Sequence, residues 1–299
     1  MSRLTTSSEQ RSSDGSSQEP SAPVAQGRRW FMGAVAATAG GFLLGQLLPI
    51  RRPAGPGSGP VPADVGMLYH QWSTPGHRSQ TEAMTDWGEQ PERYKTYSQA
   101  KQIALPDPSG YGGPTLEETV QARRSRRKYA GQSLSLEGLS RLLVAAQGIT
   151  DPQTQHRAAP SAGALYPIEV YLAVQDVTGL DSGIYHYAVQ THALELLRQG
   201  DFRQSVMEAG VGQAHLGNAN VCFILSAIFQ RTRWKYRERT YRYLLLEAGH
   251  IGQNLCLAAT AMGLGACPVG AFLDDDLNAL LGLDGQNEAA LYILATGVV

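Results

Sequence analysis

The strongest constraint on the fold is a long helical pattern near the end of the chain. Apolar residues between Leu244 and Met262 recur at steps of four, three, four, three and four positions, which is the spacing of one continuous helix face. Gly263 and Gly265 follow at once and can end the helix. A helix of this length needs a layer to pack against, so the pattern predicts a buried helix over residues 239–262 in a layered domain.

Strand-like runs could supply that layer. Residues 169–175 alternate apolar with other side chains, and residues 184–189 and 193–198 form two further runs around a short turn. Residues 220–229 are apolar almost throughout, as in a strand covered on both faces, and residues 291–299 form a last strand. Two helices precede the strands, one from Leu116 through Arg123 and one after a predicted N-cap at Ser135. The alternation predicts an α+β or α/β sandwich around a central sheet.

The first 66 residues differ in composition from the rest. Residues 1–27 are rich in Ser, Gln, Thr, Gly and Pro, so we expect a disordered tail. Residues 28–50 begin with Arg28-Arg29 and continue into a short Gly/Ala-rich apolar run, which resembles a twin-arginine export signal. Residues 51–66 form a Pro/Gly linker, and residues 67–299 form the predicted folded domain, which begins with an irregular approach up to residue 118.

Residues 28–50 also allow two other interpretations, a short transmembrane helix or a core helix, because their length is marginal for spanning a bilayer. No clear cleavage site follows, so residues 31–50 could remain as a membrane anchor. We expect export through the twin-arginine translocase, to the periplasm or to an outward-facing position on the cytoplasmic membrane.

Charge and cysteine content exclude several classes of function. The 25 basic and 26 acidic residues give a formal net charge of -1, so a nucleic-acid partner is not predicted. The three cysteines, Cys222, Cys256 and Cys267, lack CxxC or paired His/Cys spacing. Neither a disulfide framework nor a structural zinc site is indicated. With 42% hydrophobic residues the chain can bury a substantial core.

Two loops could bind a ligand. Arg123-Arg124-Ser125-Arg126-Arg127 places several guanidiniums and a hydroxyl where they could clamp a phosphate and reach a polar ring edge, although a solvated basic turn would look the same. Residues 160–167, Pro-Ser-Ala-Gly-Ala-Leu-Tyr-Pro, are small residues bracketed by prolines immediately before a strand. They would let the backbone approach a flat ligand, but they would equally suit an ordinary connection.

Two further candidates lie in and after the long helix. Glu247, His250 and Asn254 follow at steps of three and four, so they share one helix face and need partners there. Both a hydrogen-bond network at a subunit contact and a catalytic role remain open. Without a third clear ligand, no metal site is expected. The glycines of 263–270 could present backbone N–H groups beside a ring, or simply end the helix before a strand.

In this order the stretches resemble the flavin-dependent nitroreductase superfamily, and within it the SagB/ThcOx-type dehydrogenase branch. The resemblance covers roughly residues 69–299. It is carried by RRSRR at 123–127, PSAGALYP at 160–167 and YRYLLLEAGHIGQNLCLAATAMGLGACPVGAF at 241–272, with YHQWS at 69–73 and ALPDP at 104–108 in support. No Rossmann or Walker glycine spacing competes with it.

The resemblance implies an α+β three-layer sandwich with a mainly antiparallel central sheet and helices on both faces. It also implies noncovalent FMN at a homodimer interface and ping-pong hydride transfer through flavin N5. Carried over by motif, Arg123, Arg124, Ser125 and Arg127 would contact the phosphate, ribityl chain and pyrimidine edge. Pro160, Ser161, Ala162 and Gly163 would lie beside the ring from the other subunit, and Gly263, Leu264 and Gly265 near N5 and O4. Tyr166 is a further substrate or network candidate.

The implied function is an exported or membrane-anchored FMN-dependent oxidoreductase acting on a small molecule or a peptide. One alternative is azoline-to-azole dehydrogenation in ribosomal peptides, against which export argues, because a peptide-modifying enzyme works beside its cytosolic cyclodehydratase. Another is a non-catalytic flavin-binding interaction protein.

The end of the sequence departs from many superfamily members, in which a basic tail reaches the FMN phosphate, whereas this sequence ends at Val299. A second basic cluster could replace that contact or form a solvated helix face; it comprises Arg231, Arg233, Lys235, Arg237, Arg239 and Arg242.

Overall fold

The computed structural model describes residues 64–74, 86–108 and 112–299. Its elements, with η for a 3-10 helix, are α2 (Val65–Trp72), β1 (Lys101–Ala104), α4 (Leu116–Ala122), α5 (Leu136–Gln147), β2 (Ile149–Asp151), β3 (His156–Arg157), η1 (Ala162–Ala164), β4 (Ile168–Val174), β5 (Gly183–Ala188), η2 (Val189–Thr191), β6 (Ala193–Gln199), α6 (Arg203–Ala209), α7 (Ala214–Asn218), β7 (Val221–Ile228), α8 (Gln230–Tyr236), η3 (Arg237–Arg239), α9 (Thr240–Ala261), β8 (Leu264–Val269), α10 (Asp274–Leu281) and β9 (Glu288–Val298).

The amino-terminal predictions fall mostly outside these residues. The tail, the twin-arginine segment and nearly all of the linker lie within residues 1–63, which the structure does not describe. Within the described ranges, none of the helices combines the length and the apolar character needed to cross a bilayer.

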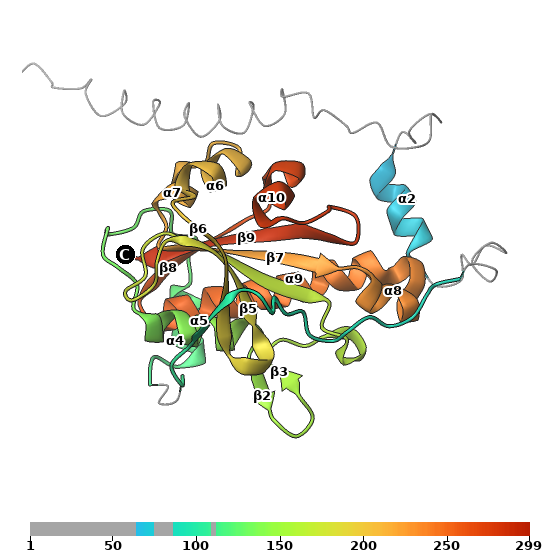
Figure 1. Ribbon diagram of the computed structural model, residues 1–299, viewed down its shortest axis with the longest axis horizontal. Helices are drawn as coiled ribbons and strands as arrows, with labels where there is room; N and C mark the ends of the chain where they lie inside the picture. The colour runs from blue at the N-terminus through green and yellow to red at the C-terminus, as the bar shows by residue number, and fades with distance from the viewer. Residues whose placement is uncertain (1–63, 75–85, 109–111) are drawn as a thin grey trace, which may run out of the picture. The chain divides into compact units, whose positions relative to one another are not determined.

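A seven-stranded sheet in the order β1-β6-β5-β4-β7-β9-β8 forms the middle layer (Figure 1). Every neighbouring pair in it is antiparallel. The central strand β4 is buried at every position, because both of its faces are covered. Its side chains alternate between two cores: Val170 and Leu172 face one cluster, and Tyr171 and Ala173 face the other.

Helices cover both faces of the sheet, which confirms the predicted three-layer sandwich. Helices α5 and α9 pack on the first face, and α6, α7 and α10 lie over part of the second (Figure 1). Helix α9 begins and ends within one residue of the predicted range 239–262, because its stripe of Leu244, Ala248, Ile251 and Leu255 is buried as the spacing requires. Ser135 caps α5 as predicted, with its hydroxyl accepting from Gly138 N–H at 3.0 Å.

Two features differ from the sequence interpretation. The approach before residue 118, predicted to be irregular, contains helix α2 and strand β1, which pairs with β6 at the edge of the sheet. Only Ile103 of β1 packs against the core, so the strand has too little alternation to be recognised. Strand β9 starts at Glu288, three residues before the predicted start, because that buried carboxylate is held by polar neighbours.

Candidate active site

The basic motif 123–127 lies along the edge strand β8. Ser125 forms a parallel bridge with Ala266, and Arg126 N–H donates to the Ala266 carbonyl at 2.9 Å. The close approach depends on Gly265, where a Cβ would lie 2.8 Å from Arg126 Cβ and 2.3 Å from Val299 Cγ1. The structure therefore brings motif 123–127 together with the glycine-rich stretch 263–270.

The motif carries positive charge that the described residues do not neutralise. Arg124, Arg126 and Arg127 are exposed and Arg123 is half-buried, and none of the four forms an ion pair within the described part of the chain. Burial raises the pKa of the Cys267 thiol, and the nearby Arg127 guanidinium opposes that rise, so Arg127 reaches the β8 side chains. Unpaired guanidiniums beside a strand edge fit a phosphate group.

The glycine-rich stretch after α9 is a helix stop followed by a strand. Gly263 has φ of 70° and open space where a Cβ would stand. Leu264 and Gly265 already belong to β8 and pair with Val298 and Gly297. Of the three predicted backbone contacts, only Gly263 therefore lies in the turn, and no side chain crowds it.

Loop 160–167 adopts a strained conformation held by side-chain contacts. Gly163, Ala164 and Tyr166 have φ of 65°, 54° and 48°, a region that non-glycine residues rarely enter. Ser161 Oγ accepts from Tyr166 N–H at 2.9 Å and bridges the loop. Pro160 is exposed, whereas Ser161 and Ala162 are half-buried.

Tyr166 is buried and contacts two arginines. It is 3% exposed, and its hydroxyl accepts from Arg157 N–H at 3.1 Å. The Arg157 guanidinium lies over its ring, 4.4 Å from the centroid. Its carbonyl accepts from Arg231 Nη1 at 3.2 Å. These contacts hold the side chain inside the protein.

The three polar residues of α9 do not form one cluster. Glu247 is buried and faces Ser161, whereas Asn254 donates to the Ala145 carbonyl of α5 at 3.0 Å. His250 is exposed, and no contact joins it to Glu247 within the described residues. Helical spacing placed them on one face, but the structure buries Glu247 and leaves His250 exposed.

Lys235 and Tyr236 approach loop 160–167; the sequence suggested Lys235 only as part of the second basic cluster and did not suggest Tyr236. A Cβ on Gly163 would stand 2.9 Å from Lys235 Nζ and 2.7 Å from Tyr236 Oη. Both side chains lie at the end of α8, where a lysine within a run of arginines looked like part of a basic face. Glycine at position 163 thus allows an amine and a phenol to approach the loop backbone.

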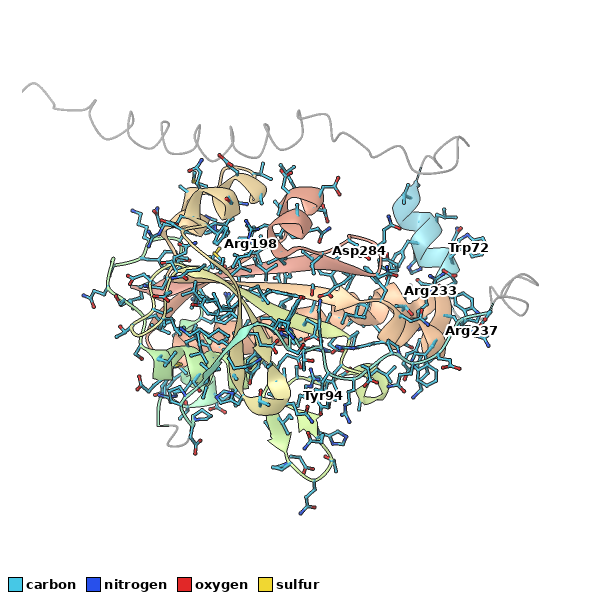
Figure 2. All side chains as sticks on the ribbon, in the orientation of Figure 1. Trp72, Tyr94, Arg198, Arg233, Arg237 and Asp284 are labelled. Atoms are coloured by element: carbon cyan, nitrogen blue, oxygen red, sulfur yellow. The ribbon has the colours of Figure 1, made fainter. Side chains whose placement is uncertain are left out.

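The rest of the second basic cluster has structural partners. Arg231 is 2% exposed and forms an ion pair with Glu169, while its Nε donates to the Glu92 carbonyl at 2.9 Å. Arg233, labelled on α8 in Figure 2, lies over the Trp87 ring. Arg239 Nη1 donates to the Ser73 carbonyl at 2.6 Å. Arg231 is thus neither a solvated residue nor free for a phosphate in this chain.

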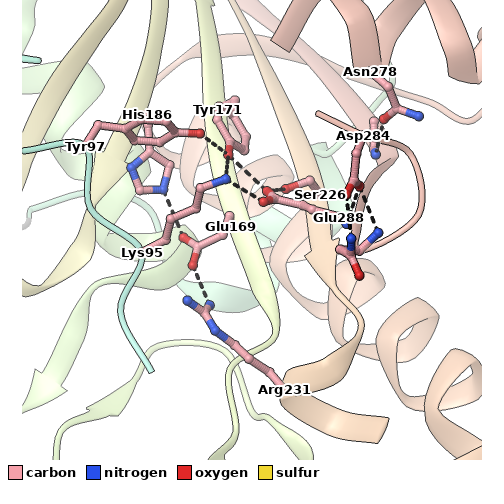
Figure 3. Close-up of polar contacts among 12 residues, drawn as sticks. Lys95, Tyr97, Glu169, Tyr171, His186, Ser226, Arg231, Asn278, Asp284 and Glu288 are labelled. Atoms are coloured by element: carbon pink, nitrogen blue, oxygen red, sulfur yellow. Dashed lines mark hydrogen bonds and ion pairs between the residues drawn. The ribbon is translucent and has the colours of Figure 1, made fainter. Parts of the chain in front are cut away.

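A buried charged network crosses the sheet beside α8, and sequence reasoning missed it (Figure 3). His186 lies between two carboxylates, 2.7 Å from Glu195 and 3.0 Å from Glu169, and Glu169 also binds Arg231. Both ring nitrogens face acceptors, so the imidazolium is the form that satisfies both. Burial opposes that charge, but the two hydrogen-bonded carboxylates outweigh it and raise the pKa of His186.

A second group of the network holds the segment before β1. Lys95 Nζ lies 2.5 Å from Glu288 and 2.7 Å from the Tyr171 hydroxyl. The Tyr171 and Ser226 hydroxyls both donate to Glu288, at 2.9 and 2.6 Å. A cavity of about 500 Å³ adjoins this network, and its polar lining includes Tyr94, Lys95, Gln102, Arg157, Glu169 and Glu195.

No group of three or more His, Cys, Asp or Glu side chains suited to a metal ion occurs within residues 64–74, 86–108 and 112–299. The three cysteines are free and buried.

Comparison with known proteins agrees with this geometry. Residues 120–298 match the nitroreductase family. The chain belongs to that family. A nitroreductase-type protein of Methanocaldococcus jannaschii is 37% identical over 166 residues, which cover 56% of this chain and 83% of the relative. The microcin B17-processing protein McbC of Escherichia coli is 32% identical over 171 residues, covering 56% of this chain and 63% of McbC.

Solved structures give the same assignment. A nitroreductase-type protein of Anabaena variabilis superimposes with a TM-score of 0.59 at 32% identity, covering 67% of this chain and 42% of that chain. A chain of the E. coli microcin synthetase McbBCD complex, with truncated pro-MccB17 bound, gives a TM-score of 0.53 at 29% identity over 66% of this chain and 77% of that chain. The match spans less than two thirds of McbC and less than half of the Anabaena chain. Family membership supports oxidoreductase activity.

Proposed function

We propose that this nitroreductase-family protein is an FMN-dependent oxidoreductase that passes hydride between two substrates in turn. The observation that carries the proposal is the placement of motif 123–127 along β8, the strand that follows the turn at Gly263, with guanidiniums that form no ion pair among the described residues. A phosphate needs such donors, and the backbone of an open turn can lie close to a flat ring.

Different residues of this chain would bind different parts of FMN. Arg123, Arg124, Ser125 and Arg127 would hold the phosphate, ribityl chain and pyrimidine edge. Bound FMN would supply hydride acceptance and donation at N5. A guanidinium beside the N1–C2=O edge would stabilise the negative charge that reduction places there, because a preorganised cation needs no solvent rearrangement.

Loop 160–167 would complete the site from a second copy of the chain. Among the described residues of one chain, the loop lies against Lys235 and Tyr236 and is bonded to Arg157 and Arg231, and none of its hydrogen bonds reaches motif 123–127. Exposed apolar residues on α9, namely Tyr241, Leu245 and Leu246, offer a surface that a homodimer would bury. Light scattering during FMN titration tests this, and a monomer with full FMN occupancy would contradict the shared site.

Lys235 and Tyr236 are the titratable groups closest to Gly163, so they are the candidates for holding or moving a proton beside the ring. An amine and a phenol within reach of one loop position can bind a polar substrate group and exchange a proton with it. Neither group needs to form a covalent intermediate, since the cofactor would carry the difficult chemistry.

The substrate is the finer part of the proposal. Similarity to a microcin-processing protein favours a peptide, and with it azoline-to-azole oxidation. A small-molecule substrate is the alternative, favoured by the predicted export. Incubating the purified protein with azoline peptides and with small electron acceptors distinguishes the two. Flavin reduction without turnover of any acceptor would instead favour a non-catalytic flavin-binding protein.

The cofactor is tested by releasing any chromophore with acid and measuring its mass, for which FMN is expected. Arg127→Ala should weaken FMN binding by about 1.5 to 3 kcal/mol, the range for a lost charged hydrogen bond. Lys128→Ala changes an exposed neighbouring cation and is the matched control. FAD, no flavin after reconstitution, or equal losses in both variants would contradict the assignment.

Localisation is a separate proposal that depends on residues 28–50. FMN is made inside the cell, so a noncovalent flavoprotein is best exported already folded, which suits the twin-arginine route. Arg28→Lys with Arg29→Lys should retain the folded protein in the cytoplasm. Unchanged export of a reporter fused after Pro62 would contradict this route and favour an ordinary anchor.

A further inference from the structure

The cavity of about 500 Å³ beside the buried network has no part in the proposed flavin site. Its lining comes largely from the segment around Lys95, from β1 and β6, and from Arg157 at the end of β3. Strand β1 is one edge of the sheet, whereas motif 123–127 lies along β8, the other edge. Small-molecule sites have volumes of about 300–1,000 Å³, so the cavity is large enough to hold a ligand.

The charged groups around the cavity are paired with one exception. Each of three carboxylates has a cation of its own, in the pairs Glu169–Arg231, Glu195–His186 and Glu288–Lys95. Figure 3 shows the pairs of Glu169 and Glu288. Arg157 forms no ion pair among the described residues. With His186 protonated, four cations face three carboxylates, so one positive charge is left without a partner.

The carboxylates that line the cavity already hold donors on both oxygens. Glu195 Oε1 accepts from Tyr97 N–H at 3.0 Å and from Gln102 Nε2 at 2.8 Å, and its Oε2 lies 2.7 Å from His186. Each oxygen of Glu169 is likewise engaged by a neighbouring side chain. Engaged carboxylates offer little to a cationic ligand. Both the charge balance and the hydrogen bonds of the cavity therefore favour an anion.

Arg157 is a buried guanidinium with unused donors. It is 6% exposed and lies 4.4 Å from the centroid of the Tyr166 ring and 5.5 Å from that of Tyr94. Of its side-chain N–H groups, only Nη1 has an acceptor among the described residues, Gln147 Oε1 at 3.2 Å, and Nε has none. The two rings attract the cation but do not replace the acceptors that a planar guanidinium can bind. Burial lowers the pKa of Arg157 although Glu169 attracts its charge, as expected of a cation without a bonded anion.

We propose that this cavity binds a small organic acid, with Arg157 holding the carboxylate and the apolar part of the lining holding the rest of the ligand. That apolar part comprises Tyr94, Ala104, Ala188, Val189 and Ala193. A bound carboxylate would supply acceptors that Arg157 lacks and would neutralise the surplus charge. A monoanion fits better than a phosphate monoester, whose charge of about -2 would exceed that surplus.

Isothermal titration of the purified protein with 3-phenylpropionate at pH 7 tests the site. We expect one molecule bound per chain with a Kd of about 1 mM or lower, which a probe of this size can reach. The neutral 3-phenylpropionamide has nearly the same shape and should bind at least about tenfold more weakly, because it lacks the charge that pairs with the guanidinium. Absence of binding by the acid, or equal binding of acid and amide, would overturn the proposal.

Two substitutions locate the bound acid. Arg157→Met removes the guanidinium and should weaken binding of 3-phenylpropionate at least about tenfold. Ala104→Phe fills the cavity from the exposed end of β1 and leaves Arg157 in place, so it decides the question if Arg157→Met does not fold. Arg233→Met removes an exposed guanidinium outside the cavity and should bind the acid as wild type does. Wild-type affinity in either cavity variant would place the acid elsewhere and overturn the proposal.

Titration in the presence of FMN separates this inference from the proposed function. The cavity and motif 123–127 lie at opposite edges of the sheet, so saturating FMN should leave binding of the acid unchanged. Displacement of the acid by FMN would overturn the inference, because the acid would then occupy the flavin site. Absence of FMN binding would reject the proposed function, while the acid, the amide and the variants would still decide the cavity.

Discussion

Arg231→Met is the sharpest test of the buried charged network. The substitution keeps an unbranched apolar stem but removes the ion pair with Glu169 and the donors to the carbonyls of Glu92 and Tyr166. Glu169 would stay buried beside His186 with one oxygen unpaired. Removing one partner of a buried pair costs about 3–5 kcal/mol, because the remaining charge is left uncompensated.

Urea unfolding of the FMN-free protein at pH 7 and fixed concentration measures the loss. Arg233→Met is the matched control on the same helix, since Arg233 is exposed and lies over the Trp87 ring without an ion pair among the described residues. We expect about 0.5 kcal/mol or less for that variant. Adding Glu169→Gln to Arg231→Met should recover at least about 1 kcal/mol, because the amide removes the stranded charge.

The pH dependence gives an independent check. The pKa of Glu169 is lowered because His186 and Arg231 outweigh its burial, so its contribution is lost as pH falls through the lowered value. The pKa of His186 is raised, so its contribution is present below about 6.5 and is lost as pH rises through the raised value. An Arg231→Met loss below 1 kcal/mol, or equal losses in both single variants, would refute the reasoning.

Three further predictions concern Glu247, Gly265 and the buried cysteines. Wild-type stability should fall by up to about 3 kcal/mol between pH 4.5 and pH 8 from Glu247, because its pKa rises from 4.5 to about 7 on folding; Glu247→Gln should remove this slope in urea unfolding. Gly265→Ala should lower the free energy of unfolding by about 1–3 kcal/mol and weaken FMN binding, because the added Cβ would meet Val299 and Arg126. Gly270→Ala is the control and should change little, because the space beside Gly270 is open. Equal effects of the two substitutions would contradict this reasoning. The 3 buried cysteines should react with a thiol reagent only on unfolding, and rapid reaction of the native protein would contradict their burial.

Periodicity predicted the elements whose burial follows one regular face. The steps from Leu244 to Met262 gave α9 within one residue at each end, and Ser135 marked the start of α5. The alternation in β4 identified Val170 and Leu172 as core. These predictions succeed because each depends only on the local spacing of apolar residues and on the need to bury one apolar face.

The buried network could not be predicted in the same way. Glu169 and His186 occupy strand positions that would be exposed in a sheet with one solvent-facing side. Arg231 lies in a run of basic residues that is typical of a solvated helix. The segment that covers this face, around Lys95 and Tyr97, has no regular pattern of its own. Which polar residues become partners is decided by tertiary contacts between distant segments, which spacing does not encode.

The network and the loop are parts of one structural arrangement. Hydrogen-bonded charges run from Glu195 on β6 through His186 and Glu169 to Arg231, which donates to the Tyr166 carbonyl. Apolar residues could fill the same space at little cost or with a gain in stability, so stability alone does not explain buried charges. A chain of directional bonds instead fixes where Arg231 lies, and Arg231 in turn holds a backbone that would otherwise leave its left-handed conformation.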